Sequence, residues 1–240
     1  MAAKYGKIFM ALTLLGREFM ELYPINLKLT GRRCAVVGGG TVAERKAVAL
    51  IAAGAQVSIF SPVLTAKLTG LQQDQCLTWI PRSYEIGDLD KFFLVSCATD
   101  QPEINRQAAE EARAAGALVN VADAPEISDF YVPAHIAHGD LLITVSTGGG
   151  SPALARQLKH KIAEDFGPEY GYYLALVAKL RLEMKERLAT SKDREKFWRE
   201  TIDHETLDLL RAGKFSEAEE RIRHAVSCAW PESSNGSRGS

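Results

Sequence analysis

Blocks of hydrophobic and polar residues alternate along the first half of the chain and predict strands and helices in turn. Residues 34–37 form a compact apolar run that three glycines follow, and residues 42–53 are rich in Ala, Val, Leu and Ile. Gly54 is expected to close this helix, and residues 56–60 supply a second strand before Ser61-Pro62 interrupts it. One strand-helix-strand unit is therefore complete within about thirty residues.

The same alternation continues to residue 121 and predicts a parallel sheet with helices on both faces. The expected elements are a helix near residues 62–71, a strand at 77–80, a buried strand at 91–96, a helix from Pro102 to Ala115 that Gly116 ends, and a strand at 117–121.

The pattern changes after Asp123-Ala124-Pro125. Residues 129–134 read as an irregular aromatic link, and residues 140–146 as one more strand that ends in a second glycine cluster. From residue 153 to about residue 226 the apolar spacing is helical. The predicted fold class is thus α/β: a Rossmann-type parallel sheet domain followed by a mostly helical remainder.

Composition narrows the class of protein. The 240 residues are 46% hydrophobic and 25% charged, which is typical of a protein that buries a sizeable core. With 29 Lys and Arg against 30 Asp and Glu, the net charge is -1. This balance argues against a broadly basic nucleic-acid binder, so we expect no nucleic-acid partner.

The cysteines and the first residues bear on the compartment. Four widely separated cysteines show no zinc spacing, which favours buried free thiols in a reducing compartment. The apolar run at residues 8–15 is too short to span a bilayer, and no small-residue cleavage site follows it. We therefore expect a cytoplasmic protein that does not act at a membrane.

The first glycine cluster fits the dinucleotide-binding pattern G-x-G-x-x-A over residues 38–43. Gly38 would make the tight turn, Gly40 would let a pyrophosphate approach, and Ala43 would pack closely between helix and strand. The following helix would offer its free N–H groups to the phosphates. A purely structural glycine turn is the alternative interpretation.

The second strand lacks the acidic residue that usually binds the adenosine ribose. Ser61 stands in its place, and no arginine lies beside it to select a 2′-phosphate. A serine can still hydrogen-bond a ribose hydroxyl, so the sequence favours NAD over NADP as the cofactor.

Several segments together resemble precorrin-2 dehydrogenase / sirohydrochlorin ferrochelatase, the dehydrogenase module of siroheme synthase. They cover roughly residues 21 to 165. The matching stretches are Tyr23-Pro24-Ile25-Asn26-Leu27, residues 31–40 and 42–46, Ala98-Thr99-Asp100, residues 120–125, Phe130, Pro133 and residues 145–152.

The resemblance implies a reaction, namely NAD-dependent oxidation of precorrin-2 to sirohydrochlorin, followed in many relatives by Fe²⁺ insertion. It implies Asp123 as the catalytic carboxylate, which would accept a proton in both steps. The alternative is that Asp123 only caps the loop before Pro125. The length leaves no room for an attached methyltransferase domain, so we expect the dehydrogenase module alone.

The resemblance also implies the organisation of the chain and its binding residues. The expected domains are an NAD-binding Rossmann domain at 21–125, a dimerisation and active-site segment at 126–165, a helical domain at 166–228 and a disordered tail at 229–240. A homodimer is implied. The expected cofactor-binding residues are Gly38, Gly39, Gly40, Thr41, Val42, Ser61, Pro62, Ala98, Thr99, Asp100 and Val121; the expected substrate-binding residues are Ser146, Thr147, Gly148, Gly149 and Ser151.

The second glycine cluster has a physical reading of its own. Ser151 can cap the next helix and Pro152 suits its first position, so we expect unpaired N–H groups that suit a carboxylate. The implied tetrapyrrole substrate carries eight carboxylates, which predicts local segregation of positive charge in a nearly neutral protein. Thr147 stands where relatives often carry a serine near the active site.

For the other candidate residues, a structural or surface role explains the sequence at least as well as a functional role. His135 and His138 have no partner at metal-ligand spacing, so we expect no fixed metal site. Tyr170 and Tyr173, with Tyr172 nearby, would share a helix face. A macrocycle could stack on this face, or the face could pack against another helix. Arg45 and Lys46 are expected to be solvated or to form salt bridges with neighbouring residues. An NAD-sensing regulatory module and a dehydrogenase for another small acid remain the competing functions.

Overall fold

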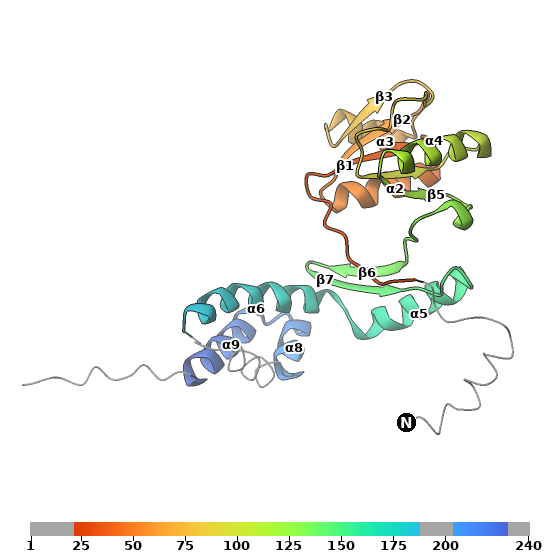
Figure 1. Ribbon diagram of the computed structural model, residues 1–240. Helices are drawn as coiled ribbons and strands as arrows, with labels where there is room; N and C mark the ends of the chain where they lie inside the picture. The colour runs from red at the N-terminus through yellow and green to blue at the C-terminus, as the bar shows by residue number, and fades with distance from the viewer. Residues whose placement is uncertain (1–21, 188–203, 230–240) are drawn as a thin grey trace, which may run out of the picture. The chain divides into compact units, whose positions relative to one another are not determined.

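The computed structural model describes residues 22–187 and 204–229, and the elements in these ranges confirm the predicted α/β class (Figure 1). The chain forms two compact units that divide between Val132 and Pro133. The finer domain boundaries expected near residues 125 and 165 stay predictions. The apolar run at 8–15 lies outside the described residues, as does the expected tail beyond Ala229.

The first unit is built on a five-stranded parallel sheet with the order β3-β2-β1-β4-β5. Each strand is short and strongly apolar, as expected of strands covered on both faces. The strands are β1 (Arg33–Val37), β2 (Gln56–Phe60), β3 (Leu77–Ile80), β4 (Leu94–Cys97) and β5 (Leu118–Val121).

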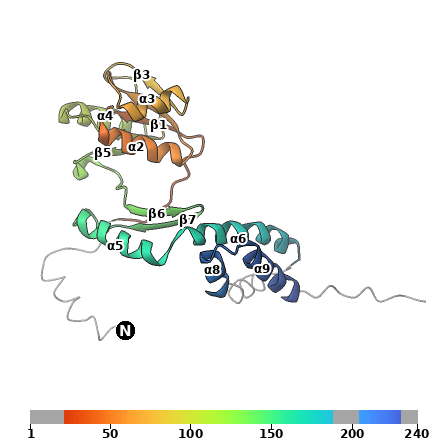
Figure 2. The ribbon, with the colours of Figure 1, turned by 180° about the vertical axis from the view of Figure 1, so that it is seen from behind.

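Helices cover the two faces of this sheet (Figures 1 and 2). Alternate residues of β1 point to opposite faces: Val36 joins a core with residues of α2 (Thr41–Ala52) and α3 (Ala66–Gln73), and Val37 joins a core with α4 (Pro102–Ala114). Small side chains of α2, among them Ala43 and Ala47, are fully buried and let this helix approach the sheet closely.

The free edge of the sheet, at β5, is closed by the chain segment that returns from the short 3-10 helix η1 (Pro125–Ile127). The Asp129 carboxylate accepts a hydrogen bond from Val119 N at 2.8 Å, and Asp129 N donates to Val119 O at 2.8 Å. Ser128 Oγ accepts from Val121 N at 2.9 Å. The outward backbone groups of β5 are thus paired within the unit, which removes an exposed sheet edge.

Several boundaries differ from the sequence prediction for identifiable reasons. The helix expected near residues 62–71 begins at Ala66, because Thr65 N donates to Gly39 O and the Thr65 hydroxyl caps the helix at Leu68 N. The strand expected from residue 91 begins at Leu94. Cys34 and Cys97 are buried free thiols as expected, and burial raises their pKa values to about 11 and about 12. Cys76, in contrast, is exposed.

The second unit begins with an antiparallel hairpin of β6 (Ala134–His138) and β7 (Leu141–Val145). Strand β6 was not predicted from the sequence. Gly139-Asp140 forms the connection between the strands, and a two-residue Gly-containing loop between short alternating runs was the available signal. The hairpin contacts α5 (Pro152–Asp165) and the start of α6 (Pro168–Arg187), where Gly171 lies against the backbone of His138.

The helices α6, α8 (His204–Arg211) and α9 (Phe215–Ala229) share a small apolar core. Tyr173, Leu176 and Leu180 form the buried stripe of α6, and they pack with Leu207 and Ile222. The tyrosines therefore serve helix packing: Tyr173 is 4% exposed, and the exposed Tyr172 contacts the Phe215 ring at 4.8 Å. Within the described residues, no helix is long and apolar enough to cross a membrane.

We expect Asp129→Ala to destabilise the first unit by about 1–3 kcal/mol, because the buried Val119 N–H loses its acceptor. Urea denaturation followed by circular dichroism measures this free energy of unfolding. Asp129→Asn keeps an acceptor oxygen at the same place and is the matched control. Equal stability of the alanine and asparagine variants would contradict this role of the carboxylate.

Candidate functional site

The residues predicted to bind the cofactor in the first unit gather at one edge of the sheet. The glycine turn follows β1, Ser61 follows β2, Ala98 follows β4 and Asp123 lies just beyond β5. All five strands are parallel, so these positions share the carboxyl edge. The direction of the strand order reverses between β1 and β4, and ligands of open α/β sheets bind at that point.

Two of the three glycines are required by close backbone packing. Gly38 has φ +120°, and a Cβ there would lie 2.4 Å from Ala98 O at the end of β4. A Cβ on Gly39 would lie 2.0 Å from Val63 O and 2.6 Å from Ser61 Oγ. Gly38 N also donates to Phe60 O at 2.9 Å. The turn therefore joins the ends of β1, β2 and β4 through contacts that exclude a side chain.

Gly40 differs, because a Cβ there would meet no atom within 4 Å. It is the N-cap of α2, and no side chain caps this helix. The first hydrogen bond inside the helix runs from Glu44 N to Gly40 O. The backbone N–H groups that precede Glu44 therefore have no acceptor inside the helix. An open backbone surface beside uncapped N–H groups fits a pyrophosphate, and Gly40, Thr41 and Val42 would hold it there.

The other expected cofactor-binding residues differ in how exposed their side chains are. Pro62 and Asp100 are exposed at the same edge, but the Val121 side chain is 4% exposed and packs in the core below α4. The hydroxyl of Thr99 donates to Asn105 Oδ1 at 2.8 Å. Ser61 is buried, and its hydroxyl donates to Val63 O at 2.8 Å. Because the Ser61 hydroxyl already donates its proton to Val63 O, it could only accept a hydrogen bond from a ribose hydroxyl.

Asp123 has a left-handed backbone, which is uncommon for non-glycine residues and is adopted by Asp and Asn more readily than by most. Ala122 N still donates to Cys97 O at 2.9 Å, so Asp123 is the first residue beyond the ladder between β4 and β5. It is exposed, and its φ of +58° lies in the left-handed region. Non-glycine residues hold this conformation at a cost of order 1 kcal/mol and are enriched at functional sites. The closed edge of β5 fixes the chain on both sides of it.

Lys46 was expected to be solvated or to form a salt bridge with a neighbour, but it is half-buried and its hydrogen-bond partner is a neutral amide. Its ammonium donates to Asn120 Oδ1 at 2.6 Å. This hydrogen bond joins α2, which carries Lys46, to β5, which carries Asn120. Burial and the neighbouring Arg45 lower the pKa of Lys46, while the carboxylate of Asp123 acts in the opposite direction. Asn120 could have indicated this contact from the sequence, because a polar side chain in a buried strand needs a hydrogen-bond partner.

The residues expected to bind the substrate form one loop of the second unit. Ser151 caps α5 at Leu154 N as predicted. The expected unpaired N–H groups are largely absent from this loop, since Gly148 N donates to Ser146 Oγ, Gly150 N to Thr147 O and Ser151 N to Thr147 Oγ1. The Thr147 hydroxyl in turn donates to Ser151 O at 3.1 Å. These contacts form a hydrogen-bonded turn from Ser146 to Ser151.

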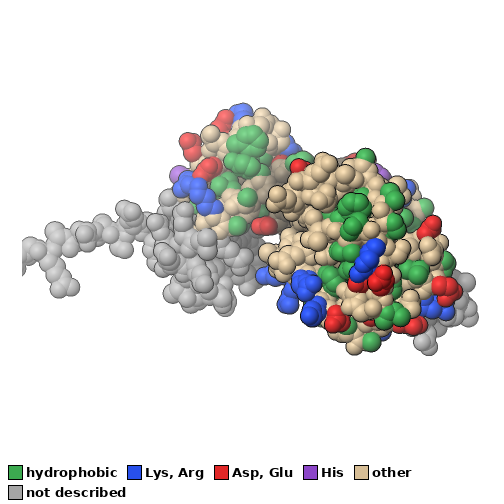
Figure 3. Space-filling model, turned by 90° about the horizontal axis from the view of Figure 1, so that it is seen from above, with side chains coloured by type: hydrophobic (Ala, Val, Ile, Leu, Met, Phe, Trp, Pro, Cys, Tyr) green, Lys and Arg blue, Asp and Glu red, His purple; other side chains and the backbone are tan. Residues whose placement is uncertain are grey.

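The described residues contain no group of three or more metal-ligating side chains. His135 lies on the exposed side of the hairpin, and His138 is half-buried at its turn. On the face of the molecule seen in Figure 3, basic and acidic side chains lie interspersed. Segregation of positive charge in a substrate cleft stays a prediction.

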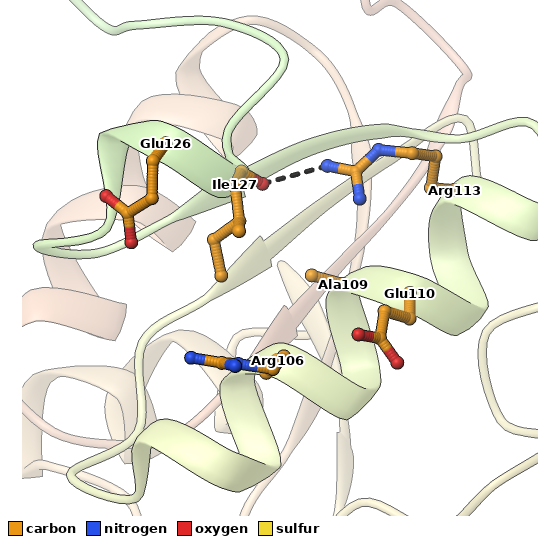
Figure 4. Close-up of a pocket in the computed structure, with 6 residues that line it drawn as sticks. All are labelled: Arg106, Ala109, Glu110, Arg113, Glu126 and Ile127. Carbon is orange, nitrogen blue, oxygen red and sulfur yellow. Dashed lines mark hydrogen bonds between the residues drawn. The ribbon is translucent and has the colours of Figure 1, made fainter.

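A small surface pocket lies away from the predicted site residues, between α4 and η1 (Figure 4). Arg106 and Arg113 flank it, but Glu110 and Glu126 balance their charge. Figure 4 shows the Arg113 guanidinium turned to the backbone, where it donates to Ile127 O at 2.8 Å. Arg113 also pairs with Asp129 at 3.1 Å. Its contacts brace the loop that follows Asp123.

Two family profiles match the chain. The first, described as putative NAD(P)-binding, covers residues 25–134, and the second, described as the sirohaem synthase dimerisation region, covers residues 169–226. The first match contains the sheet, the glycine turn and Asp123, so this unit is an NAD(P)-binding domain. The second contains α8 and most of α6 and α9.

Curated relatives include the siroheme synthases of Thioalkalivibrio sulfidiphilus and Methylobacillus flagellatus, which are 36% and 38% identical over 86% of this chain. The aligned part is 42% and 44% of their lengths, so the chain spans less than half of these relatives. Among solved structures, SirC, a precorrin-2 dehydrogenase, is similar with a TM-score of 0.68 and 26% identity. This match covers 85% of the chain and 100% of SirC.

The contrast between neighbouring glycines gives a test of the cofactor site. We expect Gly40→Ala to change the free energy of unfolding by about 1 kcal/mol at most, but to weaken NAD binding by about tenfold or more. The added Cβ would occupy the open surface that the pyrophosphate approaches. Isothermal titration calorimetry and urea denaturation measure the two effects.

Gly39→Ala is the comparison variant, and we expect it to lose stability by about 2 kcal/mol or more because its Cβ collides with backbone. NAD binding by Gly40→Ala at the wild-type affinity would show that the pyrophosphate does not rest on this turn.

Proposed function

The chain belongs to the family of siroheme synthase N-terminal modules, and from this premise we propose that it oxidises precorrin-2 to sirohydrochlorin with NAD⁺. The observation that carries the proposal is the position of Asp123, an exposed carboxylate held with positive φ at the same sheet edge as the open glycine turn. A nucleotide and a proton acceptor would therefore meet at one place.

The reaction removes a hydride and a proton from the substrate. NAD⁺, when bound, supplies the hydride acceptor. Gly40, Thr41 and Val42 would hold its pyrophosphate through backbone N–H groups at the uncapped start of α2. Asp123 accepts the proton, because an ionised carboxylate is a base and its loop is fixed by the closed edge of β5.

NAD⁺ is proposed over NADP⁺ on the residues that follow β2. Ser61-Pro62-Val63 presents no guanidinium for a 2′-phosphate, and Val63 is 72% exposed where an adenosine would lie. The buried Ser61 hydroxyl retains lone pairs that can accept from a ribose hydroxyl.

The tetrapyrrole and the partner subunit belong to the same proposal. SirC is named as a precorrin-2 dehydrogenase, and the matched dimerisation region supports a homodimer of this chain. The residues expected to bind the substrate are Ser146, Thr147, Gly148, Gly149 and Ser151, in the loop that leads into α5. The backbone of this loop is open at Gly148 and Gly149, since a Cβ at either would meet no atom within 4 Å.

Insertion of Fe²⁺ into sirohydrochlorin is the second candidate activity. It needs a base that takes up pyrrole protons as the metal enters, and Asp123 could supply one. Fe²⁺ is a substrate in this reaction. Following the visible spectrum after adding Fe²⁺ to sirohydrochlorin, with and without the protein, separates a dehydrogenase that also inserts iron from one that does not.

We expect Asp123→Asn to lower kcat for precorrin-2 oxidation by about a hundredfold or more, because the amide cannot accept the proton. Asparagine tolerates the left-handed backbone, so the fold and NAD affinity should remain. NADH absorbance measures turnover, and titration calorimetry measures binding.

Asp90→Asn, on an exposed residue before β4 at the opposite edge of the sheet, is the matched control. The wild type should prefer NAD⁺ to NADP⁺ in the same assay. Full turnover by Asp123→Asn would refute the assigned role. A wild type that binds NAD⁺ but oxidises no precorrin-2 would instead favour a regulatory module.

A further inference from the structure

A buried side chain of α4, Asn105, holds the loop that follows β4. Asn105 is 6% exposed. Its Oδ1 accepts from Thr99 N at 3.0 Å and from the Thr99 hydroxyl at 2.8 Å, and its Nδ2 donates to Thr99 O at 3.0 Å. One amide therefore binds both backbone polar groups of Thr99 together with its hydroxyl.

Asn105 differs from the other residues that α4 buries. These are Ala108, Ala109 and Ala112, whose small side chains pack in the core of the sheet. Asparagine is a weaker helix former than alanine, and a buried amide needs hydrogen-bond partners. The side chain of Asn105 finds these partners on Thr99, so the residue serves the loop after β4 rather than the helix itself.

The loop held in this way forms one side of the switch point between β1 and β4. Ala98 N donates to Val37 O at 2.8 Å. A Cβ on Gly38 would lie 2.4 Å from Ala98 O and 3.2 Å from Thr99 N. The glycine turn thus packs directly against residues 98 and 99, while Asn105 holds Thr99 from α4. These contacts leave the backbone at residues 98 and 99 little room to move.

The same loop is open to a ligand. Thr99 is half-buried and Asp100 and Gln101 are exposed, whereas Asn105 is buried and can act on a ligand only through the loop. A dinucleotide lies across the switch point of such a sheet, with one nucleotide on each side of it. The loop after β2 belongs to the adenosine side, so the loop after β4 belongs to the nicotinamide side.

An ordered loop at this place favours binding. A loop that is disordered before binding loses conformational entropy when the ligand orders it, and this loss weakens the affinity. A loop that the protein has already ordered avoids the loss. The three hydrogen bonds from Asn105 exist in the protein without a ligand, so they supply this order in advance.

We propose that Asn105 is a positioning residue for the cofactor: by binding the N–H, the C=O and the hydroxyl of Thr99, it orders residues 98–101 for the nicotinamide half of NAD⁺. The inference rests on the proposed binding of NAD⁺ and is independent of which substrate is oxidised. The alternative is that Asn105 only stabilises the connection between β4 and α4.

ADP and NAD⁺ separate the two roles, because ADP carries the adenosine and a pyrophosphate but lacks the nicotinamide half. We expect Asn105→Ala to weaken NAD⁺ binding by about tenfold and ADP binding by less than about twofold, since only the nicotinamide half would have to order the loop. Titration calorimetry on the full chain measures both affinities. Equal losses for the two ligands, or no loss for either, would overturn the proposal.

Glu111→Ala is the matched control. Glu111 lies on the same helix and accepts from Gly87 N at 3.0 Å, from Leu89 N at 2.7 Å and from the Tyr84 hydroxyl. Its removal therefore also deletes three hydrogen bonds to a loop, the one between β3 and β4. The control should lower Tm as Asn105→Ala does, but both affinities should stay within about twofold of the wild type. A selective loss of NAD⁺ affinity in Glu111→Ala would show that overall stability is responsible, and would overturn the assignment to Asn105.

Hydrogen exchange at the Thr99 amide, followed by NMR, tests the order of the loop in the wild type. The amide donates to Asn105, so it should be protected before any cofactor is added. Exchange should be about tenfold faster in Asn105→Ala and should slow again when NAD⁺ binds. A wild-type amide that becomes protected only when NAD⁺ binds would show that the loop is not ordered in advance, which refutes the inference even if the alanine variant does not fold.

Binding and turnover fail separately in these experiments. A protein that shows the expected pattern of NAD⁺ and ADP affinities but oxidises no precorrin-2 supports the role of Asn105 and refutes the proposed function. A protein that oxidises precorrin-2 with the wild-type affinity for NAD⁺ in Asn105→Ala supports the proposed function and refutes the role of Asn105.

Discussion

The close approach of three backbone segments at the carboxyl edge of the sheet governs the rest of the first unit. Gly38 brings the end of β1 against Ala98, and Gly39 brings it against the loop that follows β2. These contacts fix where α2 begins, and Ala43 and Ala47 then allow the helix to lie close on the sheet. The N-terminus of α2 and the side chain of Lys46 reach the site because this helix is placed so tightly.

The placement of Asp123 depends on a second constraint, which is the closure of the β5 edge. A parallel edge strand exposes backbone groups, and here Ser128 and Asp129 satisfy them. The chain must turn sharply between β5 and this returning segment, and Asp123 occupies that turn with positive φ. Arg113 braces the returning segment from α4. The carboxylate is therefore carried by a loop with little freedom to move.

The sequence predicts those features that depend on local patterns. Apolar runs, glycines after helices and the Ser151-Pro152 cap predicted the five strands of the parallel sheet, the ends of α2 and α4, the start of α5 and the α/β class. The contact between Lys46 and Asn120 was missed because it joins residues 74 positions apart. The start of α3 was wrong because the glycine turn, rather than local propensity, holds residues 61–65. Strand β6 was missed because alternating small residues and histidines give a weak hydrophobic signal.

The net charge of the protein says less about anion binding than the local sources of positive potential do. An overall charge of -1 does not attract an anionic cofactor or an anionic substrate from a distance. Positive potential is instead supplied at short range, by the uncapped N-terminus of α2 and by one ammonium that a neutral amide holds. Such sources act where water is partly excluded, so they are stronger per charge than exposed lysines and less sensitive to salt. The anion binding proposed for this edge of the sheet would therefore not require a basic protein.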